Sequence, residues 1–295
     1  ISRAIKNKYS DQITEVIVHT GQHYDQNMSE VFFDELGIPK PAYNLNVGSG
    51  SHGKQTAAMI SGIEEILCNE KPSCIVLYGD TNSTLAGAVA ASKIHIPVVH
   101  IEAGLRSFNK SMPEEINRIM CDHVSTLLFS PTATGLKNLL SEGFKSHVDK
   151  PYTIRNPKLY HCGDVMYDNS LHFAKVAESK TSVLKDLGLN SNEFILATIH
   201  RDNNTDNKER LSSIFRSFDK ISREKNLKII LPLHPRTAKL LKQNLDERVF
   251  NSVTGNDNIK IIPPVSFLEM IALEKNAFLV MTDSGGVQKE AFFFQ

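Results

Sequence analysis

Carboxylate and guanidinium groups gather in the stretch IEAGLRSFNKSMPEEINR, which covers residues 101–118. The apolar segment IPVVH runs directly into it, so we expect Glu102 at the end of a buried strand. A carboxylate beside a buried strand needs a partner or a raised pKa, and carboxyls of that kind serve as general acids and bases. Glu114 and Glu115 follow a proline and could simply open a helix, where negative charge suits the dipole. The stretch therefore points to acid–base chemistry, and Arg106 and Arg118 could be its counter-charges or could be solvated.

Polar residues also follow other apolar segments that we interpret as strands. Ligands bind beyond the carboxyl ends of the strands in open parallel sheets. Any one of these ends could be an ordinary helix N-cap, but their number in both halves of the chain predicts a cleft between two domains. The ends are His19-Thr20-Gly21-Gln22-His23, Gly79-Asp80-Thr81-Asn82, His100-Ile101-Glu102, His200-Arg201, His234-Pro235-Arg236 and Thr282-Asp283-Ser284-Gly285-Gly286.

The segment TDSGGVQKE in the second half is predicted to bind an anion. It ends an apolar segment, presents Gly285 and Gly286, and opens a helical pattern. Backbone N–H groups at a helix start bind phosphate, and glycines let the ligand approach the backbone closely. Donors from the neighbouring strand ends would add positive charge, so we expect a ligand rich in phosphate.

The order of the elements predicts an α/β fold. Apolar strands at 15–21, 74–80, 96–104 and 126–131 alternate with helical patterns, and the rhythm resumes with strands at 194–200, 227–235, 259–265 and 277–286. Continuous apolar strands between helices are typical of parallel sheets that are covered on both faces. We expect two Rossmann-like, doubly wound domains, residues 1–166 with the carboxylates and residues 167–295 with the phosphate site. The polar stretch from Gly163 to about Ser191 is expected to connect them.

Composition excludes several classes of protein. The chain has 295 residues, with 33 basic and 33 acidic side chains, which argues against non-specific nucleic-acid binding. No apolar run is long enough to span a membrane, and the start has no apolar signal core, so we expect a cytoplasmic protein without a membrane partner. The four cysteines show no metal-binding spacing and are expected to be reduced core residues.

Two cofactor sites are considered and set aside. The segment GSGSHG at residues 48–53 fits GxGxxG, but it follows a poor strand, and no acidic residue follows at the end of a next strand. The histidines include no HExxH or HxH pair. We therefore expect neither a nicotinamide cofactor nor a metal.

The chain resembles the non-hydrolysing UDP-N-acetylglucosamine 2-epimerases, whose fold is the two-domain glycosyltransferase-B type. The matching segments run in order from residue 19 to residue 291: HTGQHYD, GDTNSTLAGA, HIEAGLRS, MPEEINR, CGDVMYD, ATIHR and TDSGGVQKEA. By this resemblance the chain begins inside the family's first helix, and it ends before the family's C-terminal segment. The resemblance also implies a homodimer that makes precursors of surface polysaccharides.

The resemblance implies an isomerase that interconverts UDP-GlcNAc and UDP-ManNAc without a cofactor. UDP would leave C1 as the C2 proton is removed, giving a 2-acetamidoglucal, and UDP would then add back. The implied catalytic residues are Asp80, Glu102, Glu114 and His200. The implied UDP-binding residues are His200, Arg201, His234, Met270, Phe267, Ser284, Gly285, Gly286 and Glu290, of which Met270 stands where the family stacks an aromatic ring on uracil and Phe267 is a possible substitute.

Three alternatives remain open at this point. The segments HTGQHYDQNMSEVFF, LGIPKP and GDVMYD resemble a branch that acts on UDP-2,3-diacetamido-2,3-dideoxyglucuronic acid at the same carbon. A glycosyltransferase of the same fold would explain the phosphate site but not the cluster of acids. An inactive protein that binds nucleotide sugars would hold UDP without exchanging the C2 proton.

Overall fold

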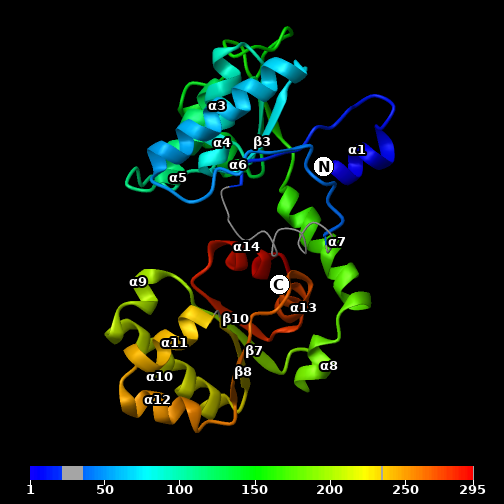
Figure 1. Cartoon of the computed structure of the whole chain (residues 1–295). Helices are drawn as coiled ribbons and strands as arrows, with labels where there is room; N and C mark the ends of the chain where they lie inside the picture. Colours follow the sequence, from blue (N-terminus) through cyan, green and yellow to red (C-terminus); the bar gives the residue numbers. More distant parts are fainter. Residues whose placement is uncertain (22–35, 234, 295) are drawn as a thin grey trace. The chain divides into compact units, whose positions relative to one another are not determined.

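The computed structural model describes residues 1–21, 36–233 and 235–294. These residues divide into two compact units, Ile1–Val165 (unit 1) and Met166–Gln295 (unit 2). Each unit contains a parallel four-stranded sheet with helices between its strands, as Figure 1 shows. The predicted α/β fold is therefore confirmed.

Unit 1 holds a main sheet and a separate pair of short strands. The main sheet has the order β3 (Ile75–Tyr78), β4 (Val98–Ile101), β5 (Leu127–Ser130) and β6 (Lys158–His161), with all neighbours parallel. The pair consists of β1 (Val18–His19) and β2 (Tyr43–Asn44). The helices are α1 (Ser2–Lys8), α3 (His52–Glu70), α4 (Asn82–Lys93), α5 (Pro113–Val124) and α6 (Ala133–Ser141).

The core of unit 1 forms where α3 and α4 pack on the sheet. Met59, Ile63 and Leu67 recur at helical spacing on α3, and all three are buried against alanines of α4 and against β3 and β4. Burial of each large side chain stabilises the fold by roughly 1.5–3 kcal/mol. A second cluster, which includes Leu128 and Leu139, joins α6 to the sheet. These helices pack against the sheet whose strand ends carry Asp80 and Glu102.

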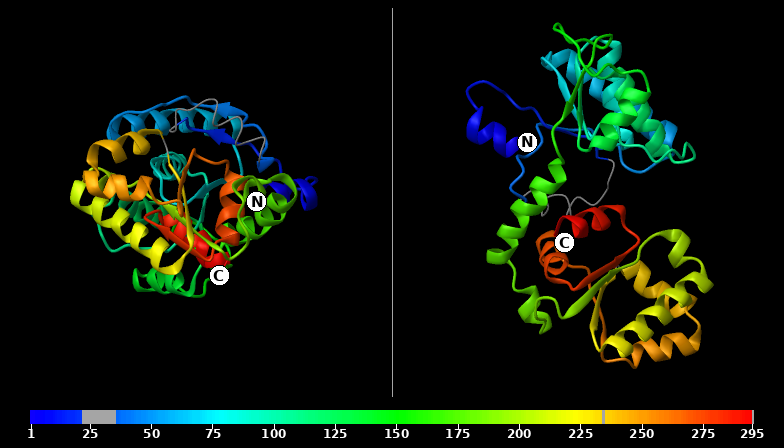
Figure 2. Two further views of the ribbon diagram at one scale, coloured as in Figure 1. Left: turned by 90° about the horizontal axis from the view of Figure 1, so that it is seen from below. Right: turned by 180° about the vertical axis from the view of Figure 1, so that it is seen from behind.

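Unit 2 has a sheet of order β10 (Leu279–Thr282), β7 (Phe194–Thr198), β8 (Lys228–Pro232) and β9 (Ile259–Ile262), again all parallel. The helices are α7 (Val165–Lys180), α8 (Val183–Leu187), α9 (Asp202–Thr205), α10 (Lys208–Lys225), α11 (Pro235–Asn244), α12 (Glu247–Thr254), α13 (Phe267–Asn276) and α14 (Gly285–Phe294). Figure 2 shows this unit from two further sides.

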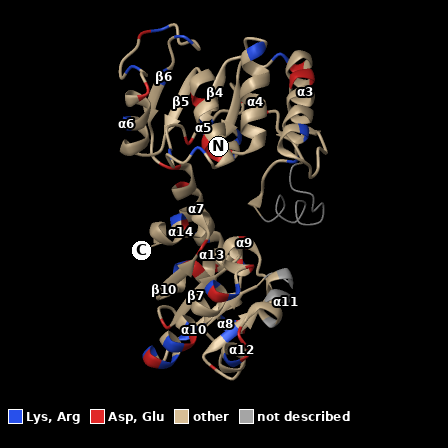
Figure 3. Ribbon diagram, turned by 90° about the vertical axis from the view of Figure 1, so that its left-hand side faces the viewer, with Lys and Arg blue, Asp and Glu red and all other residues tan. Residues whose placement is uncertain are grey.

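Strand β7 is buried along its whole length, as a central strand of a covered parallel sheet must be. Ile195 and Ala197 pack with Leu211 and Phe215 of α10. Phe194 points to the opposite face and is also buried. Figure 3 shows no charged residue on β7 or β10, so the charges of unit 2 lie on helices, on loops and on strands β8 and β9.

Two expectations are corrected here. The polar stretch after Gly163 forms α7 and α8 instead of a simple connection, and α7 packs within unit 2 because Phe173 is buried against Phe267, with ring centroids 5.3 Å apart. Of the cysteines, Cys121 alone is buried, and the exposed ones are Cys68, Cys74 and Cys162. Flanking apolar residues did not predict their burial because those neighbours point to the other face of the element. Among the described residues, no helix is long and apolar enough to cross a membrane.

Candidate active site

Two predicted acids meet at the carboxyl ends of adjacent strands in unit 1. Asp80 lies two residues beyond β3, and Glu102 comes directly after β4. A Cβ atom placed on Gly79 would lie 3.4 Å from Oε2 of Glu102. The carboxylate of Glu102 therefore lies over the backbone next to Asp80, and both acids are half-buried.

The backbone of Glu102 is strained. Its φ is +72°, a left-handed conformation that costs a side-chain-bearing residue on the order of 1–2 kcal/mol. The turn is held on both sides, because Ala103 N donates to Phe129 O at 3.1 Å and Asn138 Nδ2 donates to Gly104 O at 3.0 Å. Strain that the surrounding structure enforces is typical of functional sites.

Asp80 is not the cap of the helix that follows it. Thr81 is the N-cap of α4 and accepts a hydrogen bond from Thr84 N. The carboxylate of Asp80 instead accepts from Arg118 Nη2 on α5 at 2.5 Å. Asn117 Nδ2 donates to the carbonyl oxygen of Asp80 at 2.8 Å. Two side chains of α5, Asn117 and Arg118, therefore orient Asp80.

Glu114 and Glu115 differ although they are neighbours in the first turn of α5. Glu115 is buried and accepts from Ser107 N, Ser107 Oγ, Phe108 N and Arg118 Nη1, at 2.8–3.0 Å. Burial opposes its ionisation, but these donors outweigh it and hold the pKa of Glu115 below its ordinary value. Glu115 is thus a structural anion, whereas Glu114 is exposed.

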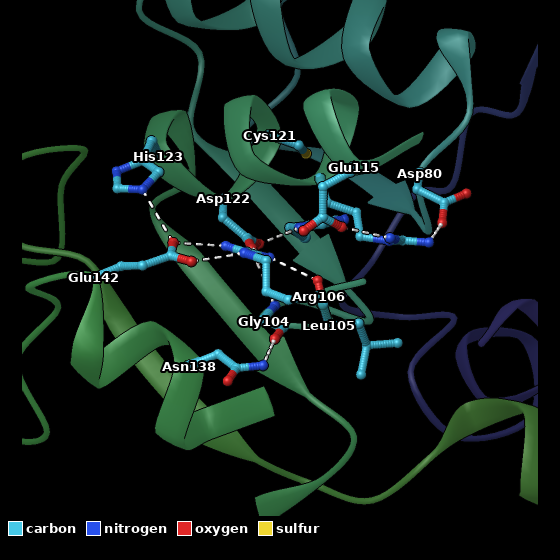
Figure 4. A network of polar contacts seen from close by, with 12 residues as sticks. Asp80, Gly104, Leu105, Arg106, Glu115, Cys121, Asp122, His123, Asn138 and Glu142 are labelled. Carbon is cyan, nitrogen blue, oxygen red and sulfur yellow. Dashed lines mark hydrogen bonds and ion pairs between the residues drawn. The ribbon is translucent and has the colours of Figure 1, made fainter. Parts of the chain in front are cut away.

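A second group of charges lies beneath the acids and was not predicted from the sequence. His100 on β4 is buried, with Nδ1 2.7 Å from Asp122 Oδ1, and Arg106 Nη1 lies 2.7 Å from Asp122 Oδ2. Arg106 also forms two bonds of 2.7 Å with Glu142, as Figure 4 shows. The signals in the sequence were a histidine inside an apolar strand and an aspartate on α5 that lies two turns after Glu115 on the buried side of the helix. Arg106 is therefore neither solvated nor a counter-charge of the predicted acids.

In unit 2, Asp283 joins the loops that follow β7 and β10. It accepts from His200 N at 3.2 Å, Arg201 N at 3.1 Å and Asn204 Nδ2 at 3.0 Å. The ring of His200 approaches the same carboxylate, with Nδ1 at 3.2 Å. Burial opposes the charge, but the donors from Asn204, Arg201 and His200 hold the pKa of Asp283 below its ordinary value. Asp283 thereby fixes the backbone of His200 and Arg201 next to the start of α14. The side chains of both residues are exposed.

The start of α14 has the arrangement of an anion site. Ser284 Oγ accepts from Val287 N at 3.4 Å, while Gly285 and Gly286 are exposed in the first turn. The first N–H groups of a helix have no acceptor within the helix. A Cβ on Gly285 would meet nothing within 4 Å, so the space in front of these groups is open. This geometry suits a phosphate.

The other predicted UDP-binding residues of unit 2 lie on α13 and α14, apart from His234, which lies outside the described residues. Phe267 and Met270 are half-buried on α13, one turn apart. Glu290 is half-buried on α14, and burial raises its pKa against the opposing charge of Lys289. These positions are compatible with the predicted roles.

Glu274 on α13 is a buried carboxyl that sequence reasoning missed. It is 3% exposed, and neither of its carboxylate oxygens has a hydrogen-bond partner in the described part of the chain. Burial, reinforced by the charge of Glu290, raises the pKa of Glu274 to about 9. The carboxyl is therefore uncharged at neutral pH.

No group of three or more His, Cys, Asp or Glu side chains within the described ranges could hold a metal ion. The groups described above that can do chemistry are the carboxylates in unit 1 and the helix N-terminus in unit 2.

Comparison with known proteins shows the family of the chain. The sequence model of the UDP-N-acetylglucosamine 2-epimerase family matches residues 5–295. A protein of Methanococcus maripaludis described as a UDP-N-acetylglucosamine 2-epimerase homolog is 50% identical over 296 residues, covering 100% of this chain and 77% of its own length. A UDP-2,3-diacetamido-2,3-dideoxy-D-glucuronate 2-epimerase of Pseudomonas aeruginosa is 49% identical over 295 residues, covering 100% of this chain and 76% of its own.

A solved structure agrees with these relatives. The crystal structure of Methanocaldococcus jannaschii UDP-GlcNAc 2-epimerase in complex with UDP-GlcNAc and UDP superimposes with a TM-score of 0.80 at 45% sequence identity. The match covers 99% of this chain and 76% of the other.

Proposed function

The chain belongs to the UDP-N-acetylglucosamine 2-epimerase family, and we propose that it interconverts UDP-GlcNAc and UDP-ManNAc. The single observation that carries the proposal is the pair of acids at the ends of β3 and β4 in unit 1. Asp80 and Glu102 lie together at the ends of β3 and β4, and Arg118 ties Asp80 to α5, whose first turn carries Glu114.

The chemistry at C2 of such a sugar requires elimination. No carbonyl group lies next to C2 to acidify its hydrogen, so direct removal of the proton is unfavourable. A carboxylate takes the C2 proton while the C1–O bond breaks, and the electron pair of that bond leaves with the diphosphate of UDP. The product is a 2-acetamidoglucal. UDP then adds back to C1, and a carboxyl group delivers a proton to the opposite face of C2.

Asp80, Glu102 and Glu114 supply the proton transfers in this proposal. One group must act as a base on one face of C2, and another must act as an acid on the other face. Two half-buried carboxylates and one exposed carboxylate provide different environments for these two roles. The left-handed turn at Glu102 supports this assignment, since the fold maintains it at a cost.

Unit 2 holds UDP in this proposal. The N–H groups of Gly285 and Gly286 and the hydroxyl of Ser284 bind the diphosphate, and His200 and Arg201 add donors beside it. These groups stabilise negative charge as the C1–O bond breaks and hold UDP for the return step. Met270, Phe267 and His234 serve the uracil and phosphate groups, and Glu290 binds the ribose.

The test is the reaction of UDP-GlcNAc in deuterated water without an acceptor sugar, followed by NMR. We expect deuterium at C2, formation of UDP-ManNAc, and traces of free UDP and glucal. Glu102→Gln should abolish the exchange and leave the Kd for UDP within about twofold, because the amide keeps the shape and loses the proton. Wild-type protein that binds UDP-GlcNAc without exchange at C2 would contradict the proposed reaction.

A second substrate has a specific observation in its favour. The relative from Pseudomonas aeruginosa named for UDP-2,3-diacetamido-2,3-dideoxy-D-glucuronate is 49% identical over the whole chain. The same site would invert C2 of this substrate, which shares UDP and the 2-acetamido group. Competition between the two substrates in the exchange assay, with kcat/KM measured for each, decides between them.

We also propose that the protein is a cytoplasmic homodimer, the dimer being suggested by the resemblance to this family. Light scattering of the purified protein, which should give twice the mass of 32.9 kDa, tests the dimer.

A further inference from the structure

A row of charged side chains, buried except at its Glu142 end, runs through unit 1 close to the acids. It begins at Glu142, passes through Arg106 and Asp122, and reaches His100, with every link at 2.7 Å. His100 Nε2 then lies 2.8 Å from the carbonyl oxygen of Gly79. Side chains from the end of α6, the loop after β4, helix α5 and strand β4 thus meet in one connected network (Figure 4).

The partners of His100 require it to be a cation. One ring nitrogen faces a carboxylate and the other faces a backbone carbonyl, and both partners can only accept hydrogen bonds. A neutral imidazole has one N–H and could satisfy only one of them, whereas an imidazolium donates to both. Burial opposes the charge, but the Asp122 carboxylate outweighs it and raises the pKa of His100 to about 10.

The surrounding charges balance. Two cations, His100 and Arg106, alternate with two anions, Asp122 and Glu142, and the thiol of Cys121 also adjoins the imidazole. The other titratable group of the network is His123, which is exposed and lies 3.2 Å from Glu142 at the far end. Removing the charge of Asp122 would leave two buried cations next to each other.

The network ends on the two loops that carry the acids. Gly79, which receives the bond from His100, directly precedes Asp80 and has a φ of +62°. Asp122 also accepts from Gly104 N at 3.1 Å, in the turn that begins with Glu102. The carboxylate of Asp122 therefore contacts the backbone of the Glu102 turn directly. It contacts the backbone next to Asp80 through His100.

We propose that Asp122 is a positioning residue for the reaction, which holds Asp80 through the His100–Gly79 hydrogen bond and holds Glu102 through Gly104. Asp122 itself touches no substrate. The inference rests on the proposed function, because it states that the network positions the acids of the proposed reaction. The charge on His100 is a property of the free protein and is measured without substrate.

The first variant is Asp122→Asn. The amide has the shape of the carboxylate but no charge, so His100 loses the anion that keeps it protonated. As a neutral ring, His100 donates from one nitrogen only, so its hydrogen bond to the carbonyl oxygen of Gly79 loses the assistance of the positive charge and weakens as pH rises. We expect the ratio of variant to wild-type kcat to fall about 10-fold between pH 6 and pH 8, a change that a purely structural defect would not produce. His123→Asn, at the exposed end of the same network, is the matched control and should keep the wild-type profile.

The charge of His100 is read directly by 15N NMR of histidine-labelled protein at pH 8. We expect imidazolium signals for His100 in the wild type and neutral-ring signals in Asp122→Asn. A neutral His100 in the wild type would overturn the inference even if the enzyme is active. A charged His100 in a protein that shows no exchange at C2 would instead contradict the proposed function and leave the charged network in place.

A second pair of variants keeps the inference testable if Asp122→Asn does not fold. The amide nitrogen of His100→Gln replaces Nε2 and can still donate to Gly79, whereas that of His100→Asn replaces Nδ1 and cannot. We expect His100→Gln to retain at least about 10-fold more kcat than His100→Asn at equal Tm, with similar KM for both. Equal losses of kcat in the two variants would show that the bond to Gly79 has no positioning role.

Discussion

Arg118 Nη2 lies 2.5 Å from Asp80 Oδ2, so a side chain of α5 orients the carboxylate that follows β3. The other end of the same guanidinium is held by Glu115, which in turn anchors Ser107 and Phe108. The position of Asp80 therefore depends on a helix that begins more than thirty residues later in the sequence. The geometry of the proposed acids is a property of the packed unit and not of the strand ends alone.

Arg118→Lys should lower kcat for epimerisation by about 10–100-fold with little change in KM. The planar guanidinium bridges Asp80 and Glu115 at the same time, and a lysine ammonium at the end of a flexible chain cannot keep both contacts. Steady-state kinetics test this prediction. Arg223→Lys, at the Arg223–Asp219 pair on α10 in unit 2, is the control and should behave as wild type. A full kcat in Arg118→Lys would show that Asp80 needs no such support.

Asp283→Asn should weaken UDP binding about 10-fold, which isothermal titration calorimetry measures. The carboxylate accepts from the backbone N–H groups of His200 and Arg201, and an amide would turn an N–H₂ group toward some of these donors. Because the pKa of Asp283 is held low, wild-type affinity should show no titration of this group between pH 5 and pH 9. Asp186→Asn, on the exposed helix α8, is the control. Unchanged affinity in Asp283→Asn would remove Asp283 from the UDP site.

Gly285→Ala should lower UDP affinity by at least about 10-fold without lowering Tm. A methyl group at this position meets no atom of the protein within 4 Å, so the fold accepts it. It would occupy the space in front of the first N–H groups of α14, where the diphosphate is proposed to lie. Gly50→Ala in unit 1, where a methyl group likewise meets nothing within 4 Å, controls for the substitution. Wild-type affinity in Gly285→Ala would place the phosphates elsewhere.

Glu274→Gln should stabilise the protein at pH 8 by about 1–3 kcal/mol, since the amide cannot ionise in the unfolded chain as the carboxyl does. The pKa of Glu274 is about 9 in the folded protein, whereas an unfolded chain ionises it near its ordinary value. Ionisation therefore favours the unfolded state increasingly as pH rises from about 4.5 toward 9, and the penalty vanishes in acid. The Tm difference between variant and wild type should shrink as pH is lowered to 5. Glu224→Gln, on the surface of α10, should show no such trend.

Much of the fold could be predicted from the sequence because the signals are local. Apolar strands that alternate with helical patterns predicted parallel sheets, and Pro113 correctly marked the first turn of α5. The acids after β3 and β4 were found for the same reason, since Asp80 and Glu102 end apolar segments. Burial was predicted less well, and three of the four cysteines are exposed, because the direction of a side chain depends on which face of its element is packed.

Only the tertiary structure decided which polar groups pair. Asp283 meets His200 and Arg201 from 82–83 residues away, and Asp122 meets His100 from 22 residues away. The different roles of Glu114 and Glu115 also needed the packed helix, because a rotation of about 100° per residue turns one toward Ser107 and the other toward solvent. Residue types and spacing determine where a strand or helix ends. Which partner a charged side chain finds is decided by contacts between distant segments, whose geometry exists only after the chain has folded.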